Sequence, residues 1–299
     1  MESVVSDYDV CDVKGKRVNN TGKGEEMNLK NLLHCSGIRL LLVAGVSCLL
    51  VQSANANLLF SEPFGQSPQA LGGAVNAGNS TAWSGGNAGL NIVSGNLTYP
   101  GLADQGGNEL SIQNASAGTS INTFASQTSG QIYYSFLFDP TVVDGANDYF
   151  TAMNPSTTGP GGSGDAIDAY YYGSGKIEIR AAAQSASAGT GAALTLGTTY
   201  LIVEEIDLTG HTASLWINPD SSTFGVAAPT ATATLSGITA SSVDNVGFKA
   251  QATTGAFLVD NLLIGTTWAD VTPAVPEPST VMLVGAGLAL MLGVIRRRS

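Results

Sequence analysis

The stretch from residue 57 to residue 275 is divided into short apolar segments by turn residues, and this pattern restricts it to an all-β fold. None of the segments has the 3.6-residue spacing of apolar side chains that marks an amphipathic helix. Two of the turns, at 173–175 and 209–210, have the length and the glycine of hairpin loops. So many short strands in one domain-sized chain predict an antiparallel sandwich or barrel. The eleven predicted strands are 58–64, 90–98, 109–114, 132–138, 149–153, 167–172, 176–182, 200–208, 212–217, 246–251 and 256–264.

Cysteine usage and charge narrow the chemistry of this stretch. Cys11, Cys35 and Cys48 all precede residue 57, so disulfides, thiol nucleophiles and cysteine–zinc sites are excluded from it. Residues 57–275 carry three basic side chains against sixteen acidic ones, which gives a net charge of −13. A surface of this sign repels nucleic acid and anionic lipid, so neither is expected as a partner.

The last 24 residues have the layout of a membrane anchor that ends in the cytoplasm. They begin with Pro-Glu-Pro at 276–278, which stays extended because proline cannot continue a helix. Residues 281–295 are apolar or glycine and, with the two residues before them, make a stretch of 17, at the short end for a transmembrane helix. Three arginines at 296–298 fix the C-terminus inside by the positive-inside rule. The sequence therefore predicts a membrane segment at 281–295.

This tail resembles the PEP-CTERM sorting signal of Gram-negative bacteria. In that family, a Pro-Glu-Pro motif, one short transmembrane helix and terminal arginines are recognised by the membrane transpeptidase exosortase. The resemblance implies that exosortase processes the chain near the motif, and that the protein accompanies exopolysaccharide and biofilm formation. An ordinary tail anchor is the alternative. The residues assigned to the signal are Pro276, Glu277 and Pro278 in the motif and Arg296, Arg297 and Arg298 in the basic end.

Met27 opens the layout of a signal peptide. Basic residues precede the apolar run 40–51, and Ala54 and Ala56 stand at the positions of an A-x-A cleavage site. We expect signal peptidase to cut after Ala56, and we interpret residues 1–26 as an extension outside the native protein. An N-terminal membrane anchor is the alternative, which the apolar run disfavours because its 12 residues are too few to span a bilayer comfortably.

Four segments of the predicted β domain resemble the concanavalin A-like jelly roll of LamG-like domains. They are Tyr-Tyr-Ser-Phe-Leu-Phe at 133–138, Tyr-Leu-Ile-Val at 200–203, the run 213–219 around Trp216, and the run 257–268 that ends in Trp268. The resemblance implies that the first strand lies near the last, which holds the two termini together. It says little about function, because a fold of this kind hosts lectins, glycosidases and adhesion modules.

These observations predict a single-pass membrane precursor whose mature domain is outside the cell. Its C-terminus would be cytoplasmic, and processing would leave the mature form at the cell surface or in the extracellular space. The predicted layout is an extension at 1–26, a signal peptide at 27–56, a jelly-roll sandwich at 57–273, a linker at 274–280, a transmembrane helix at 281–295 and a basic tail at 296–299.

An acidic run in one predicted strand is the best candidate for catalysis. Because alternate strand residues share a face, Glu205 and Asp207 point the same way. Jelly-roll glucanases carry a Glu-x-Asp-x-x-Glu pattern, but this chain has Gly210 at the third position, so the second catalytic carboxylate is missing. His211, the one histidine after residue 56, is expected in a turn and completes no triad. The sequence therefore predicts no enzyme.

Two ligand sites are further hypotheses. Asp144, Asn147 and Asp148 place three oxygen-bearing side chains within five residues, which suits calcium, although Asx turns explain the same composition. Tyr171 and Trp83 are candidates for stacking on sugar rings, with core packing as the alternative. Calcium is the one cofactor that the sequence suggests.

The predicted function is a structural or adhesive surface module associated with exopolysaccharide or biofilm. A lectin-like carbohydrate-binding module is the alternative, and a glycoside hydrolase is less favoured. The expected partners are exosortase and signal peptidase during export, the membrane through residues 281–295 before processing, and exopolysaccharide afterwards.

Overall fold

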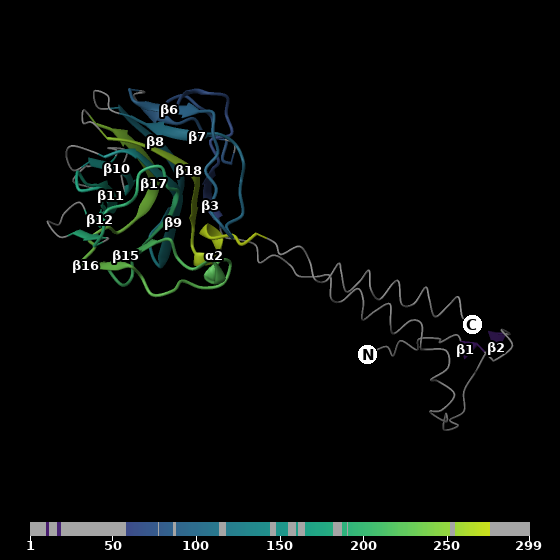
Figure 1. Cartoon of the computed structure of the whole chain (residues 1–299). Helices are drawn as coiled ribbons and strands as arrows, with labels where there is room; N and C mark the ends of the chain where they lie inside the picture. The colour runs from purple at the N-terminus through teal and green to yellow at the C-terminus, as the bar shows by residue number, and fades with distance from the viewer. Residues whose placement is uncertain are drawn as a thin grey trace, which may run out of the picture. The chain divides into compact units, whose positions relative to one another are not determined.

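The chain forms two compact units, Met1–Ala54 and Asn55–Ser299. The first contains a pair of two-residue antiparallel strands, β1 (Val10–Cys11) and β2 (Arg17–Val18). The second contains the β domain and is treated by itself below (Figure 1). The computed structural model describes residues 10–11, 17–18, 58–76, 78–85, 88–113, 118–143, 148–154, 160, 165–181, 187–189, 191–251 and 255–275.

In the described part of the second unit, one sheet has seven antiparallel strands in the order β13-β12-β11-β10-β17-β8-β5. Figure 1 shows β10, β11 and β12 following one another across one side of the domain. The strands are β5 (Ser84–Gly85), β8 (Gly118–Gln127), β10 (Asp148–Asn154), β11 (Ile167–Tyr171), β12 (Ile177–Arg180), β13 (Ser187–Gly189) and β17 (Val243–Ala250).

The other sheet of this unit, within the same described residues, has nine strands. Its order is β16-β15-β14-β9-β18-β7-β6-β4, and β3 also pairs with β18. First and last strands are thus neighbours, as the jelly-roll resemblance implies. The strands are β3 (Leu58–Glu62), β4 (Gln69–Ala70), β6 (Leu90–Val93), β7 (Glu109–Ile112), β9 (Gln131–Val142), β14 (Tyr200–Asp207), β15 (Thr212–Ile217), β16 (Ala233–Ser236) and β18 (Ala256–Gly265).

The central strands of the nine-stranded sheet are buried on both faces, which explains their continuous apolar runs. In β14, Ile202 and Ile206 enter the core between the two sheets, while Leu201 and Val203 enter a second apolar cluster on the opposite face. A strand covered on both sides needs apolar residues at successive positions rather than at alternate ones. The all-β sandwich predicted from the sequence is therefore confirmed.

The second apolar cluster is closed by loops and by the short helix α2 (Trp268–Val271). Thr267 caps the helix, and its side chain and that of Asp270 form a reciprocal capping box. The indole Nε1 of Trp268 donates to the carbonyl of Thr223 at 3.0 Å, and Ser135 Oγ donates to the carbonyl of Val271 at 2.7 Å. These bonds fasten the C-terminal end of the domain to the nine-stranded sheet.

The predicted membrane and signal segments are not described. In the residues that are, no helix has the length and apolar character needed to cross a bilayer. The signal peptide at 27–56 with Ala54 and Ala56, and the anchor at 281–295 with its flanking motifs, lie outside the described residues. They stay predictions from the sequence.

Candidate functional site

The two aromatic residues predicted to contact sugar are buried, so this prediction is wrong. Trp83 is 1% exposed and packs in the core between the sheets. Tyr171 is also in that core, with its ring centroid 5.5 Å from that of Phe138. Strand alternation places Tyr171 on the inner face of the seven-stranded sheet and turns Tyr170 and Tyr172 to the outer face.

The outer face of the seven-stranded sheet carries a row of three tyrosines. Tyr149 of β10 and Tyr170 of β11 are register partners, and their ring centroids are 5.4 Å apart in an edge-to-face arrangement. The ring of Tyr172, directly after β11, lies 6.0 Å from that of Tyr170. Tyr170 is buried in the middle of the row, while Tyr149 and Tyr172 are half-buried at its two ends.

Two of the three basic side chains of the domain lie on this row. The ammonium of Lys249 is 4.3 Å from the ring centroid of Tyr149, and it also donates to the Tyr149 hydroxyl at 3.3 Å. The guanidinium of Arg180 lies 5.3 Å from the ring centroid of Tyr170. Such contacts between cations and ring faces are favourable and hold both groups in place. We call this surface the tyrosine face and define it as Tyr149, Tyr170, Tyr172, Glu178, Arg180 and Lys249.

Carboxyl groups complete the polar part of the tyrosine face. Glu178 lies opposite Tyr170 in the sheet and accepts a hydrogen bond from Ser187 Oγ at 2.5 Å. Asp168 is the register partner of Arg180. Burial, assisted by the negative charge of Asp168, raises the pKa of Tyr170 to about 12, so its phenol is neutral at physiological pH. The face therefore combines the hydroxyls of three phenols with basic donors and an acidic acceptor.

The sequence signal for the tyrosine face is the run of three tyrosines at 170–172, whose side chains alternate between the two faces of the sheet. The sequence alone does not say which of them point outward. Three successive tyrosines must turn one or two of their rings outward, but the sheet register decides which. Lys249 and Arg180 come from strands far apart in the sequence, on β17 and β12. Neither was singled out as a site residue, because their proximity depends on the order of the strands.

Glu205 and Asp207 lie on one face of β14, as the sequence predicts, with Ile206 pointing into the inter-sheet core. Asp207 accepts hydrogen bonds at Oδ1 from the backbone N–H groups of Thr209, at 2.9 Å, and Gly210, at 2.7 Å. Burial raises the pKa of Glu205, and the neighbouring Asp207 raises it further. The turn contacts of Asp207 give this acid a structural role in the β14–β15 hairpin.

No group of three or more acidic, histidine or cysteine side chains is arranged to hold a metal ion within the described ranges. Asp144 and Asn147 of the predicted calcium site lie outside those ranges, and of Asp148 only the backbone, at the start of β10, is described. The calcium site stays a prediction.

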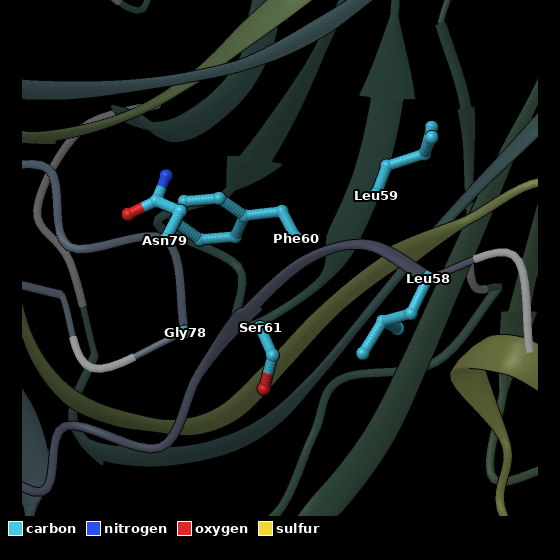
Figure 2. A pocket seen from close by; sticks show the side chains of 6 residues that line it. All are labelled: Leu58, Leu59, Phe60, Ser61, Gly78 and Asn79. Atoms are coloured by element: carbon cyan, nitrogen blue, oxygen red, sulfur yellow. The ribbon is translucent and has the colours of Figure 1, made fainter.

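A small pocket of about 160 Å³ lies where β3 meets the loop before β5 (Figure 2). Figure 2 shows the side chains of Asn79 and Phe60 among those that line it, and the amide of Asn79 donates to the carbonyl of Thr123 at 3.0 Å. Ligand pockets usually have several hundred Å³, so this one is too small for an oligosaccharide. Its lining residues are Leu58, Leu59, Phe60, Ser61, Gly78 and Asn79.

Comparison with known families recognises one segment of the chain. Residues 274–298 match the PEP-CTERM protein-sorting motif. The chain therefore carries the signal of an exosortase-sorted surface protein, as the sequence indicates. No curated protein sequence matches the chain significantly.

Solved structures of similar architecture include sialidases. One sialidase has 10% identity and a TM-score of 0.43, and the match covers 71% of this chain and 19% of that one. A Trypanosoma rangeli sialidase with the inhibitor DANA has 12% identity and a TM-score of 0.42, over 79% and 38% of the two chains. A cellulose induced protein, Cip1, has 13% identity and a TM-score of 0.39, over 70% and 97%. The chain thus spans less than half the length of these sialidases.

This comparison corrects one prediction from the sequence. The chain was expected not to be an enzyme, but the similar structures include enzymes, so that exclusion is wrong. At such low identity and TM-score the likeness concerns the fold alone and assigns no activity. The concanavalin A-like type of sandwich is not named by these structures and stays a prediction.

Proposed function

We propose that the protein is an exported, exosortase-sorted surface protein whose sandwich domain binds extracellular polysaccharide through the tyrosine face. The sorting motif supports the location. The observation that carries the binding proposal is the row of tyrosines with a cation against two of its rings, on the outer face of a sheet. An adhesive role in an exopolysaccharide matrix follows from such binding.

The chemistry of the tyrosine face fits a polyhydroxyl ligand. Tyr149 and Tyr172 each combine an apolar ring, suited to the C–H face of a sugar, with a hydroxyl that can donate or accept. Lys249 and Arg180 add charged donors, and Glu178 adds an acceptor. Because the donors are held by ring contacts and the sheet is rigid, little side-chain freedom is lost on binding.

We predict that Tyr172→Ala weakens polysaccharide binding by about tenfold, which corresponds to about 1.4 kcal/mol. The substitution removes a half-buried ring from one end of the row, and Tyr149→Ala should have a similar effect at the other end. Binding is measured by co-sedimentation of the purified domain, residues 57–275, with exopolysaccharide from the producing organism. Tyr99→Ala is the matched control, because Tyr99 is also half-buried but packs against Phe224 in the second apolar cluster, away from the tyrosine face.

Two results would contradict the proposal. Saturable binding that Tyr99→Ala reduces as much as Tyr172→Ala would exclude the tyrosine face as the binding surface. Absence of binding by the unmodified domain would leave a structural or protein-adhesive role. Reducing ends are measured in the same tube, since their release would add glycoside hydrolysis to binding.

A further inference from the structure

The chain leaves the domain through a segment that is fastened to the fold up to Val275. Beyond α2, residues 272–275 run between two loops, and Ala274 forms an isolated antiparallel bridge with Leu102. Thr272 is fully buried, and its hydroxyl donates to the carbonyl of Trp268 at 2.8 Å. Three backbone bonds tie the segment: Gly225 N to Thr272 O at 2.7 Å, Ala103 N to Pro273 O at 2.8 Å, and Val275 N to Gly101 O at 3.0 Å.

The sorting motif starts inside this fastened segment. The match begins at residue 274, so Ala274 and Val275 belong both to the motif and to the folded domain. Five residues, 276–280, separate Val275 from the apolar run that begins at Val281. Val275 and Val281 are thus six residues apart along the chain, and six fully extended residues span at most about 22 Å. While the chain is anchored, the surface around Val275 is therefore held within this distance of the membrane segment.

That surface is small, apolar and uncharged, in a domain with a strong negative charge. Val226 is 74% exposed, more than any other large apolar side chain in the described residues, and Val275 is 49% exposed. The loop that carries Gly225 contacts the exit segment, because a Cβ on Gly225 would lie 3.7 Å from the Cβ of Ala274. We call this patch the exit surface, and it consists of Gly101, Gly225, Val226, Ala274 and Val275.

We propose that the exit surface docks against the membrane-embedded enzyme that processes the tail, and that this docking presents the Pro-Glu-Pro motif to it. The inference rests on the proposed exosortase sorting. A protein partner fits better than the bilayer, because the exit surface lacks the basic and aromatic side chains that hold proteins at lipid headgroups. Clustered exposed apolar residues on a soluble domain commonly mark a protein interface.

The test is processing of the full chain in a host that contains the enzyme, followed as conversion of precursor to mature protein. Val226→Glu should slow conversion by at least fivefold, since it places a charge in the docked interface. Val143→Glu is the matched control, because Val143 is also an exposed valine, with 38% of its surface exposed. It directly follows the C-terminal end of β9, whereas the contact of β9 with α2 is made near the other end of the strand, by Ser135. Equal conversion in both variants would overturn the proposal.

Three further measurements separate the explanations. An unchanged melting temperature for Val226→Glu shows that it folds, and a lower one would attribute slow conversion to misfolding and overturn the proposal. Weaker binding of Val226→Glu to phosphatidylethanolamine–phosphatidylglycerol vesicles would assign the surface to lipid instead. A variant with alanine at 276–278 tests the proposed sorting itself. If this variant is still converted to mature protein, the proposal of sorting by this motif is wrong. If this variant is not converted but Val226→Glu is converted normally, only the docking proposal is wrong.

An insertion tests the role of the short connection. Eight Gly and Ser residues placed between Val275 and Pro276 release the domain from the membrane segment and lower the effective concentration of the exit surface at the enzyme. In that background Val226→Glu should change the conversion rate by less than twofold. An undiminished effect would overturn the inference that the short connection enforces docking.

Discussion

Glu62→Ala is expected to lower the free energy of unfolding by about 4 kcal/mol, because it removes the acceptor for four buried or half-buried donors. The carboxyl of Glu62 is fully buried and accepts from Phe64 N, Trp83 Nε1 and Asn76 Nδ2, each at 2.8 Å, and from Gln66 Nε2 at 3.2 Å. A buried donor left without a partner costs about 1–3 kcal/mol. Chemical denaturation of the purified domain measures the loss.

The position of Glu62 explains why the effect should exceed that of an ordinary buried polar group. Phe64 has a φ of 49°, which is unfavourable for a residue with a side chain, and its N–H bond to Glu62 holds that conformation. Trp83 contacts Phe60 and Phe248 in the core, so its indole cannot turn to water for a new partner. The substitution therefore disturbs a turn and an aromatic cluster together.

Two variants serve as controls for this prediction. Glu62→Gln keeps the size of the side chain but directs an amide NH₂ at donors, so an intermediate loss is expected. Glu178→Ala removes a half-buried glutamate from β12 and should cost less than about 1 kcal/mol. A loss below about 1 kcal/mol for Glu62→Ala would mean that water satisfies the released donors.

The strands were predictable from the sequence where they contain β-branched or aromatic residues. All eleven predicted segments overlap an observed strand, including the β11–β12 and β14–β15 hairpins. The segment Gly118–Gln127, now β8, is not predicted because only Ile121 and Phe124 among its ten residues are large and apolar, and three residues apart they show no period-two alternation. Its strand conformation comes from pairing with β17, a contact between residues more than a hundred positions apart.

The sequence predicts which side chains of a strand share a face, but not which of the two faces points into the core. The alternation rule places Glu205 with Asp207 and opposes both to Ile206, and the structure agrees. It cannot say whether the acidic pair or its neighbours face the core, because a shift of one residue reverses every position. Glu204 shares the inner face with Ile206 and is fully buried, a placement that the alternation rule alone does not give.

Glu204 gives the second large expected effect: it makes the domain less stable as the pH rises from about 4.5 to about 8. Its carboxyl is fully buried, and among the described residues neither oxygen has a hydrogen-bond partner. Burial raises the pKa of Glu204 from 4.5 to about 8. Below pH 4.5 both folded and unfolded chains carry the proton. Between pH 4.5 and pH 8 only the folded chain keeps it, so stability falls with pH throughout this window.

Glu204→Gln isolates this contribution, because glutamine has nearly the same shape and does not titrate. The variant and the unmodified domain should have similar stability at pH 4.5, and the variant should be more stable at pH 9 by on the order of 4 kcal/mol. Burial also raises the pKa of Asp260 to about 8, so Asp260 lowers the stability of both proteins as the pH rises. This contribution is the same in the two proteins and cancels in the comparison. Denaturant midpoints at pH 4.5, 6, 7.5 and 9 measure the difference. If the two curves stay parallel, Glu204 must be solvated or paired, since an isolated buried carboxyl cannot ionise without this cost.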